Sequence, residues 1–567
     1  MDGQAFRAYR NLLGLSVACP GYTLCFQHIQ KSPGAFPASL CRLEIDPEYL
    51  QIPEWAGLSP PRITAAEDYV LRAFNRGVRH HAKQNRGFEG SGSFQLVGMP
   101  QQILKRNIVR LFGESTSIAF RVSLPGSSKR KVMGEEAVRM LIFELPAIVL
   151  SVKAQIAVEK RLRQHCEGVE DMLFLQARLF DEGLIAFIGD GSLLPRESGA
   201  SDLPASGDAV PFKSPESLAV VVNMPNAGKV RGMGIRPGIT ALVGGGYHGK
   251  STLLNALARG VYPHIPGDGR EKVVAGRNAV LVSAEQGRSI KGLDISSFIG
   301  NLPQGADSKK FTTRNASGST SEAAAIVENV LAGAELLLID EDVSATNFLI
   351  RDHRMRELIP EDPITPFLDR ARELYENFFV STLIIAGSSS EYLAVADQVI
   401  AMHEYLPVDI TARARSLDLP PVPLPSIALK IADQRVLARE NFNPAYTNER
   451  LQKSVPVRIK ALRGQECEVL EYGMEQIDLR WLTGLVDPGQ IRTIGYCLFL
   501  ARRLKLSEDR CSPTVLAQRL AAVIHDKGLD ILQPPDSPPL FFTQVRLLEI
   551  AGAINRLRSL NIEENDE

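Results

Sequence analysis

The residues of this sequence that are best suited to chemistry form a glycine-rich run, GGGYHGKST, at residues 244–252. The run matches the pattern G-x-x-x-x-G-K-[ST]; the apolar stretch ITALV precedes it and the helical stretch TLLNALARG follows it. Glycines let successive backbone N–H groups turn toward phosphate oxygens, and the N-terminus of a helix adds positive dipole character. The run therefore predicts a nucleoside triphosphate site. Its predicted binding residues are Gly244, Gly245, Gly246, His248, Gly249, Lys250, Ser251 and Thr252.

A second acidic pattern, ELLLIDED, ends an apolar run at Asp340 and Glu341. Because a buried parallel strand ends at the edge of its sheet where phosphates bind, Asp340 is placed to hold Mg²⁺. The Ser251 hydroxyl is the expected second ligand of this ion, and Lys250 would neutralise the β- and γ-phosphates. Glu341 is placed to act as the general base for the attacking water. The two patterns together predict Mg²⁺-dependent ATP hydrolysis with Lys250 and Glu341 as catalytic residues.

A third pattern, NASGSTSEAA, lies between the first two at residues 315–324. Its SGS core, Ser317 to Ser319, resembles the Leu-Ser-Gly-Gly-Gln signature of ATP-binding cassettes, and VSATN at residues 343–347 resembles their D-loop. In cassettes the signature of one subunit closes on the γ-phosphate held by the other, and a helix N-terminus is a natural anion site. The resemblance implies a homodimer with ATP at its interface. It adds to the nucleotide-binding residues Ser317, Gly318, Ser319 and Asn347.

Three positions depart from the usual cassette pattern. The stretch LIIAGSSSEYL places Ser388 or Ser389 where the switch histidine would contact the γ-phosphate, and Ser388 is our catalytic candidate there. A serine can form a hydrogen bond but carries no positive charge, so hydrolysis would be slow. In VSAEQGRS, Glu285 and Gln286 are equally placed as ligands of Mg²⁺. Phe212 is the candidate for stacking on adenine, with a plain packing role as the alternative.

These motifs need a scaffold of alternating strands and helices. Between residues 215 and 409, the short apolar runs ITALVGGG, NAVLVSAE, ELLLIDED and STLIIAGSS alternate with helical stretches. This alternation is typical of an α/β sheet with helices on both faces. At roughly 100–200 residues per domain, a chain of 567 residues is expected to hold about three domains. We expect a mixed α+β domain at residues 1–205, a P-loop ABC-type domain at 206–415 and a mainly helical domain at 416–567.

The two flanking domains carry weaker patterns. The N-terminal domain is expected to contain a hairpin at residues 115–132 and a helix over 135–170 that breaks at Pro146. The C-terminal domain is expected to contain a strand pair near residues 458–472 followed mostly by helices.

The whole chain resembles the family of predicted ATPases of the ABC class. The matching stretches extend over nearly all of the sequence and include SGSFQLVGMPQQILKR, FIGDGSLLPRESG, GGGYHGKSTLLNAL, LLLIDEDVSATNFLIRD and EIAGAINRLRSL. The resemblance implies a soluble protein without transmembrane domains, in which family-specific domains flank an ABC ATPase core. A relative in trypanosome mitochondria is associated with RNA editing, which suggests an RNA-binding role.

The charge distribution agrees with a polyanionic partner. The first 165 residues hold 22 Lys and Arg against 13 Asp and Glu. Many of the basic residues fall in the stretch 72–94, which reads as flexible loops with Phe88 and Phe94 close by, and others at 105–106 and 129–131. Such loops suit sequence-tolerant binding of RNA or single-stranded DNA through backbone charge and base stacking. The alternative is an ordinary solvated surface.

Composition bounds the remaining possibilities. No apolar run approaches the roughly 18 residues that span a bilayer, and the polar N-terminus lacks a signal-peptide core, so we expect a cytoplasmic protein without a membrane partner. The seven cysteines form no Cys-x-x-Cys pair and are expected to be reduced thiols. Three functions stay open: an ATP-driven clamp on nucleic acid, an ATP-gated scaffold for protein partners with little hydrolysis, and a P-loop kinase. The signature, the D-loop and Glu341 argue against the kinase.

Overall fold

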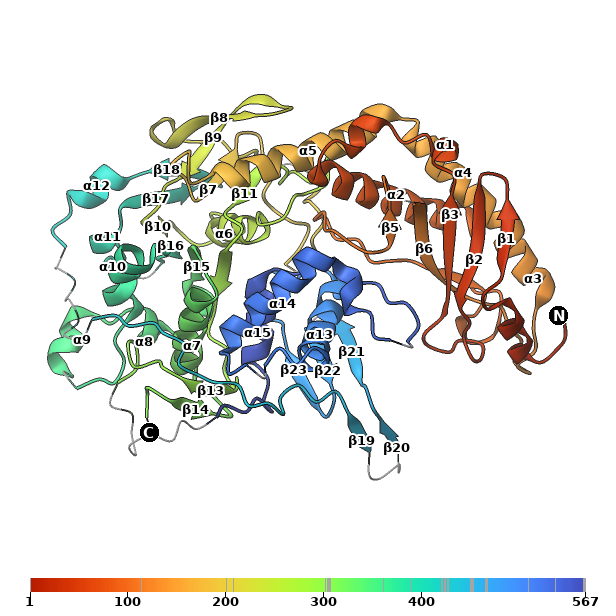
Figure 1. The fold of residues 1–567 in the computed structure, drawn as a ribbon. Helices are drawn as coiled ribbons and strands as arrows, with labels where there is room; N and C mark the ends of the chain where they lie inside the picture. The colour runs from red at the N-terminus through yellow and green to blue at the C-terminus, as the bar shows by residue number, and fades with distance from the viewer. Residues whose placement is uncertain are drawn as a thin grey trace. The chain divides into compact units, whose positions relative to one another are not determined.

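The computed structural model of the chain has two compact units (Figure 1). The first comprises Met1–Glu170 with Leu529–Gln544, and the second comprises Asp171–Gly528 with Val545–Glu567. The division into three domains at residues 205 and 415 follows the motifs and stays a prediction. The structure describes residues 2–563 except 114, 200, 208, 301, 303–306, 360, 388, 420, 421, 423, 424, 426, 427, 449–452, 464–467, 508 and 536.

An antiparallel sheet forms the centre of the first unit. Its strands lie in the order β1 (Ser16–Cys19), β2 (Tyr22–His28), β3 (Ser39–Ile45), β6 (Thr116–Ser123) and β4 (Ser93–Gln95), and β5 (Val109–Arg110) also pairs with β6. Helix α2 (Pro60–His81) begins where the Ser59 hydroxyl accepts the Arg62 N–H and a proline occupies the first turn. The rings of Phe74 in α2 and Phe120 in β6 lie 5.4 Å apart, so α2 packs on this sheet.

Two local predictions in this unit are wrong. The predicted hairpin at residues 115–132 has its first strand, β6, but Gly126 and Val132 form only an isolated bridge, because β6 pairs with β3 and β4 instead. Pro146 does not break the helix, since α4 (Leu145–Ile156), which contains it, continues directly from the helical residues before it. The helical stretch starts with α3 (Gly134–Val138) and a π-helical segment, and its break falls before α5 (Glu159–Arg178).

The helices from α3 to α5 bear on the membrane question. In the part of the chain that the structure describes, no single helix is long and apolar enough to cross a membrane. The bent pair 134–156 and 159–178, with an angle of 71° between its arms, meets the length and composition criterion only when both arms are taken together.

A six-stranded sheet organises the second unit and confirms the predicted α/β alternation. Its strand order is β12 (Ala279–Val282), β15 (Leu336–Asp340), β16 (Ser381–Ile385), β10 (Ile239–Val243), β17 (Gln398–His403) and β18 (Leu406–Asp409). All neighbours pair in parallel except β17 and β18. Helices cover the sheet as a buried parallel sheet requires. These are α6 (Lys250–Arg259), which contacts β12 and β15, α7 (Gly318–Leu331), which contacts β12, and α10 (Phe367–Phe378), which contacts β10 and β16.

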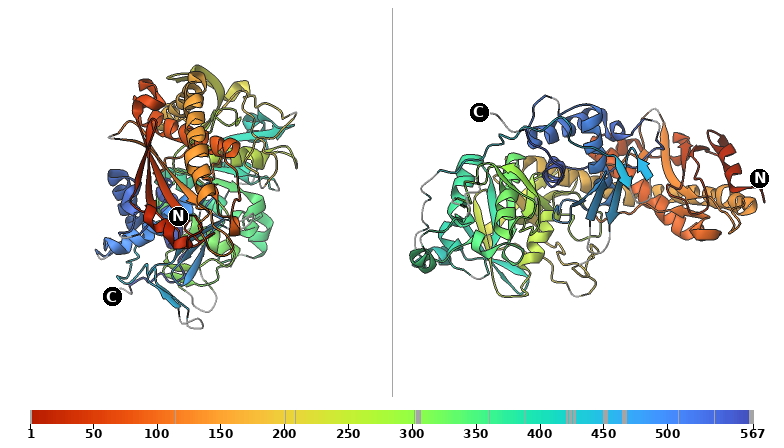
Figure 2. Two further views of the ribbon diagram at one scale, coloured as in Figure 1. Left: turned by 90° about the vertical axis from the view of Figure 1, so that its right-hand side faces the viewer. Right: turned by 90° about the horizontal axis from the view of Figure 1, so that it is seen from below.

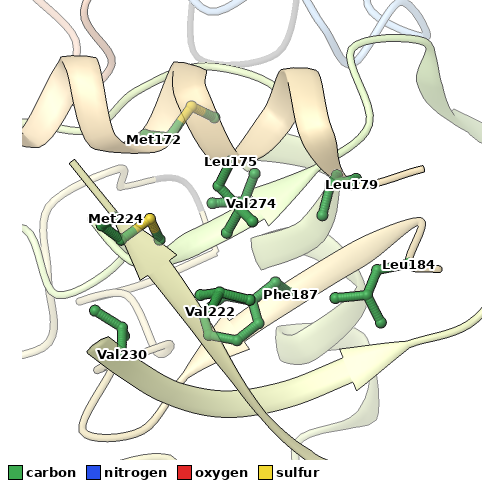
Figure 3. Close-up of a cluster of buried hydrophobic side chains, with 9 residues drawn as sticks. All are labelled: Met172, Leu175, Leu179, Leu184, Phe187, Val222, Met224, Val230 and Val274. Carbon is green, nitrogen blue, oxygen red and sulfur yellow. The ribbon is translucent and has the colours of Figure 1, made fainter. Parts of the chain in front are cut away.

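A smaller antiparallel sheet in the same unit has three strands before the P-loop strand and one after it. It has the order β11 (Val273–Ala275), β7 (Ala186–Gly189), β9 (Gly228–Ile235) and β8 (Ala219–Met224). Figure 3 shows its apolar core, in which Met172 and Leu175 of α5, with Leu179 directly after the helix, face side chains of the sheet such as Phe187 and Val222. Burying such side chains stabilises the fold by roughly 1.5–3 kcal/mol each.

The C-terminal part of the second unit has the predicted strand pair and a third strand. These are β21 (Ile459–Arg463), β22 (Glu468–Tyr472) and β23 (Glu475–Asp478), followed by α13 (Pro488–Arg503), α14 (Pro513–Lys527) and α15 (Leu547–Asn555). Helix α13 packs on β21 and β22, and α15 contacts α7 beside the six-stranded sheet. Figure 2 shows these strands and helices, coloured in blues, from two further directions. The remaining named elements outside the 3₁₀ turns are α1 (Pro47–Leu50), β13 (Ile290–Leu293), β14 (Phe311–Thr313), α8 (Thr346–Leu349), α9 (His353–Leu358), α11 (Tyr392–Val395), α12 (Thr411–Arg415), β19 (Tyr446–Asn448) and β20 (Lys453–Val455).

The cysteines agree with the expectation of reduced thiols. Cys467 lies outside the described residues. The other six are free: Cys19, Cys25, Cys41, Cys166, Cys497 and Cys511.

The basic stretch at residues 72–94 is largely structural rather than a set of flexible loops. Its first part belongs to α2, where Arg72 contacts the buried Asp68 at 2.6 Å. Arg86 is buried against Glu144, and Phe94 is buried as well. The basic side chains that remain exposed are Arg76, Arg79, His80, His81, Lys83, Lys105, Lys129, Arg130 and Lys131.

Asp68 holds the centre of this arrangement. Its carboxylate contacts Arg72, Arg106 at 3.0 Å and His165 at 3.1 Å. Burial alone would raise the pKa of Asp68, but these three partners outweigh it and keep the pKa well below its usual value. The arginines therefore compensate a buried charge.

Replacing Asp68 with Ala should destabilise the first unit by about 3–5 kcal/mol, because two arginines and His165 would lose their buried partner. Amide hydrogen exchange in α2 measures the opening free energy of this unit. The control is Arg79→Ala, an exposed position on the same helix, which should change the value by no more than about 0.5 kcal/mol. Unchanged protection in Asp68→Ala would contradict the structural role.

Candidate nucleotide site

The strand order brings the catalytic motifs to one edge of the six-stranded sheet. β16 lies between β10 and β15 and pairs in parallel with both. Three neighbouring parallel strands therefore end together, and their C-terminal loops start at Gly244, Glu341 and Ala386. Ligands of open α/β sheets bind at this carboxyl edge. The arrangement places the predicted phosphate loop and the predicted acidic pair around a common position.

The phosphate loop needs its glycines for steric reasons. Gly244 has φ +135°, and a Cβ there would lie 2.5 Å from the carbonyl oxygen of Met402. Gly249 has φ +92° at the N-cap of α6. No heavy atom lies within 4 Å of a Cβ built on Gly246. The loop thus keeps an open, backbone-lined face next to the N-terminus of a helix, which fits a phosphate.

Lys250 lies at the mouth of this loop. Its ammonium group donates hydrogen bonds to the carbonyl oxygens of Gly244 at 2.7 Å and Gly245 at 2.8 Å. His248 is joined to the next loop, because its Nδ1 accepts the backbone N–H of Glu404 at 2.8 Å. Ser251 and Thr252 lie in the first turn of α6, directly behind the lysine.

The acidic pair is held by backbone contacts. Asp340 ends β15, is buried, and accepts the N–H of Asp342 at 3.1 Å. Glu341 accepts the N–H of Gly387 at 2.7 Å, which fixes its carboxylate against the loop that follows β16. Ser388, the catalytic candidate in this loop, lies outside the described residues. The Ser389 hydroxyl accepts the N–H of Glu391 at 3.3 Å within the turn.

The signature and D-loop residues meet within one chain. Ser317 caps α7 and is exposed, and its hydroxyl accepts the N–H of Thr320 at 3.3 Å. Ser319 is buried instead, and its hydroxyl donates to Asn347 Oδ1 at 3.0 Å. In this arrangement Ser317 presents the accessible hydroxyl of the pattern.

A buried carboxyl group joins the same two segments. Glu322 of α7 is fully buried and accepts the N–H of Ala345 in the D-loop at 2.7 Å. Burial raises its pKa to about 7, against the lowering effect of its hydrogen bonds with Ala345 and Ser344. The sequence analysis missed Glu322, since a glutamate inside a helix gives no sign of burial.

The structure distinguishes the two candidate Mg²⁺ ligands, Glu285 and Gln286. Both lie in the segment VSAEQGRS, residues 282–289, which we call the Q-loop region. Glu285 is buried, and both of its carboxylate oxygens accept hydrogen bonds from Arg556 at the end of α15. Gln286 is exposed. Because an arginine occupies the carboxylate of Glu285, Gln286 is the better placed of the two to reach a metal ion. Arg556 lies in the stretch EIAGAINRLRSL, where the sequence offered no partner for it.

Phe212 does not offer a stacking surface, since its side chain is buried. Its backbone N–H donates to Ser192, and its carbonyl oxygen accepts from Gly191, each at 2.8 Å. The ring therefore has a packing role. An exposed aromatic ring near the phosphate loop belongs instead to Tyr405, which is 55% exposed in the turn between β17 and β18. Its Cδ1 atom would lie 3.3 Å from a Cβ on Gly249.

Tyr405 lines an open pocket of about 540 Å³. Apolar side chains make up most of the lining, which suits the flat face of a base. The sequence could not single out Tyr405, because its neighbourhood is made by pairing of β17 with the P-loop strand. The lining residues are Val210, His403, Glu404, Tyr405, Leu406 and Val408.

The donor set at the carboxyl edge fits Mg²⁺ carried by a nucleotide. Mg²⁺ usually binds through one or two side-chain oxygens together with substrate phosphates and water. Ser251 and Asp340 supply a hydroxyl and a carboxylate of this kind. Within the described residues, no group of three or more His, Cys, Asp or Glu could hold a metal alone.

Three family models match consecutive parts of the chain. The N-terminal model of ATPases of the ABC class matches residues 1–154, the ABC ATPase P-loop domain matches 158–421, and the MRB1590 C-terminal domain matches 461–563. The chain belongs to the ATPases of the ABC class.

A relative of this ABC-class ATPase is an uncharacterized protein of Methanocaldococcus jannaschii. It is 29% identical over 273 residues, which cover 46% of this chain and 57% of the relative. Among solved structures, cbiO1 from Clostridium perfringens, part of the ABC transporter complex cbiONQ, is 14% identical with a TM-score of 0.24 and covers 40% of this chain and 87% of its own. A metal-chelate-type ABC transporter in an inward-facing conformation is 13% identical with a TM-score of 0.25 over 40% of this chain and 82% of its own.

The raised pKa of Glu322 predicts a pH dependence of stability. Since its pKa is about 7 in the folded chain against an ordinary 4.5, the protonated carboxyl stabilises the folded state below about pH 4.5. This contribution, about 3 kcal/mol in full, is lost as pH rises through 7. Glu322→Gln should therefore gain stability relative to the wild type as pH rises from 5 to 8 (about 2–3 kcal/mol).

Thermal unfolding of both proteins across this pH range measures the difference. Glu335→Gln is the control, because Glu335 is exposed just after the same helix and should give a constant offset. A constant offset for Glu322→Gln as well would rule out the proposed burial of its charge.

Proposed function

We propose that this ABC-class ATPase binds ATP with Mg²⁺ and hydrolyses it at an interface between two copies of the chain, coupling hydrolysis to binding of RNA or single-stranded DNA. The observation that carries the proposal is the placement of β16 between β10 and β15. It sets the phosphate loop, which leads to Lys250, and the acidic pair Asp340 and Glu341 at the same edge of the sheet. The contact of Glu341 with Gly387 adds a fixed orientation for the carboxylate.

Each residue then has a distinct role. The phosphate loop binds the triphosphate through backbone N–H groups, and Lys250 neutralises the β- and γ-phosphates. Ser251 and Asp340, with the side chain of Gln286, would hold Mg²⁺, which neutralises charge that develops on the phosphates. Glu341 orients water and accepts its proton. Moving the ammonium of Lys250 from loop carbonyls to phosphate oxygens is the first rearrangement expected on binding.

The second copy completes the site through its signature. The exposed Ser317 hydroxyl and the N-terminus of α7 would approach the γ-phosphate of the opposite copy. Ser319 and Asn347 support this end of the helix from inside. Ser388 would replace the switch histidine with a neutral hydrogen-bonding group. The proposal keeps the three domains at residues 1–205, 206–415 and 416–567, and a cytoplasmic location.

A second candidate function is an ATP-gated scaffold for protein partners. The sequence between β16 and α11, AGSSSE, contains no histidine to contact the γ-phosphate. Slow hydrolysis would then leave the ATP-bound dimer as the lasting state. The two functions differ in whether nucleic acid changes turnover.

Turnover of ATP by the purified protein, measured alone and with single-stranded RNA or DNA, tests the function. Glu341→Gln should reduce turnover by about 100-fold or more, because the general base is lost while the carbonyl acceptor for Gly387 stays. It should also form an ATP-dependent dimer on size-exclusion chromatography. Lys250→Ala is the matched control that should weaken ATP binding about 10-fold or more and stay monomeric.

Each outcome has one meaning. Glu341→Gln that stays monomeric with ATP contradicts the two-copy site. Turnover that is lost in the variant but unaffected by RNA and DNA favours the scaffold. Stimulation by nucleic acid that weakens with salt supports the coupled function.

Tyr405 is proposed as the residue that stacks on the base of ATP. Tyr405→Ala should raise the dissociation constant for ATP by roughly 5- to 100-fold, the range for loss of one base–aromatic contact. Tyr405→Phe keeps the ring and should bind like the wild type. Phe212→Leu, a change at the buried ring, should leave ATP affinity unchanged when the protein stays folded. Equal affinity in Tyr405→Ala and the wild type would remove Tyr405 from the site.

A further inference from the structure

A polar pocket of about 200 Å³ lies beside the Q-loop region, separate from the pocket at Tyr405. It is formed by residues 285–289, by residues at and just after the end of β23, and by residues that follow α15. All three segments belong to the second unit. Its lining residues are Glu285, Gln286, Gly287, Arg288, Ser289, Gln476, Asp478, Trp481, Arg556 and Arg558.

The arginines of this pocket exceed the charge that their carboxylates can compensate. Arg556 is paired with Glu285, and Asp478 with Arg480 at 2.6 Å. Arg288 is paired with Glu328 through one nitrogen. Its buried Nε and Nη1 atoms have no hydrogen-bond partner among the described residues. A buried guanidinium with unsatisfied donors favours an additional acceptor nearby.

Arg558 supplies an exposed cation at the same place. Its guanidinium donates only to backbone, to the carbonyl oxygens of Gly287 at 3.0 Å and Arg314 at 2.8 Å. Among the described residues no carboxylate lies within ion-pair distance of it. These two contacts hold the side chain in place without neutralising its charge. A fixed guanidinium whose charge is not compensated is suited to binding an anion.

Trp481 adds an aromatic ring to the lining. It is one of two tryptophans in the chain, and it is only partly buried. An aromatic ring next to fixed arginines and amide groups is the combination with which proteins bind single-stranded nucleic acid, by stacking a base and contacting a phosphate. In the N-terminal stretch, Arg72 and Arg86 are paired and Phe94 is buried, whereas Phe88 is exposed.

We propose that this pocket binds one nucleotide of a single-stranded RNA or DNA, with the base on Trp481 and a phosphate on Arg558. The inference rests on the proposed nucleic-acid coupling and names where the strand binds. Gln286 and the Arg556–Glu285 pair line the same pocket. A bound nucleotide therefore touches the segment that is proposed to reach Mg²⁺, and this gives the strand a direct route to the ATP site.

The fluorescence of Trp481 tests the proposal. Trp55→Phe leaves Trp481 as the sole tryptophan. Titrating this protein with a single-stranded oligouridylate should give saturable quenching that weakens as salt is added. The affinity of a labelled copy of the same oligonucleotide, measured by anisotropy, should fall about 10-fold or more in Trp481→Ala. Arg558→Ala, an exposed change, should weaken binding and reduce the salt dependence, while Trp55→Phe alone should bind like the wild type.

The two measurements separate the possible failures. If the oligonucleotide binds by anisotropy but leaves Trp481 fluorescence unchanged, and both variants bind like the Trp55→Phe protein, the strand binds elsewhere and only this inference is overturned. If no binding occurs even at low salt, the inference and the nucleic-acid coupling both fail. If polyglutamate quenches Trp481 and the oligonucleotide does not, the pocket takes an acidic protein segment and the inference is again overturned.

Discussion

The nucleotide site depends on the parallel pairing of β16 between β10 and β15. A parallel strand covered on both faces is mostly apolar, and Leu336–Asp340 and Ser381–Ile385 are buried at every position. Asp340, the charged residue of these two strands, lies where its strand ends. Because parallel strands end on the same edge, the strand pairing alone brings the phosphate loop, Asp340 and Glu341 together there.

Polar contacts then fix the loops that leave this edge. Glu341 binds the backbone of Gly387, Glu322 binds the D-loop at Ala345, and Glu285 binds Arg556. Each contact joins segments that are distant in the sequence. Leaving a buried carboxylate such as Glu322 or Glu285 without its partner costs several kcal/mol of folding free energy. These contacts therefore disfavour other arrangements of the loops. In the last of them, the C-terminal helix α15 and the Q-loop segment share one ion pair, which ties the two parts of the second unit together.

Ion pairing also explains why the sequence alone does not show which arginines are available to bind a polyanion. Arg72 and Arg86 look like a polyanion-binding stretch by composition, yet they compensate Asp68, Glu136 and Glu144. Arg558 stands in a less basic region, yet its guanidinium faces only carbonyl groups. Counting charge along the chain cannot separate the two cases, because the compensating carboxylate lies in another element.

The sequence by itself determined the phosphate loop, the acidic strand end, the signature helix and the α/β alternation, since each is a local pattern whose chemistry depends on neighbours in the chain. It also predicted that Glu285 and Gln286 follow a strand, and the structure shows that this strand, β12, pairs with β15. It could not say that Glu285 pairs with Arg556, that Phe212 is buried, or that Tyr405 and Trp481 line pockets. Only the tertiary structure decided these, because burial and pairing depend on contacts between segments far apart in sequence, which no local spacing encodes.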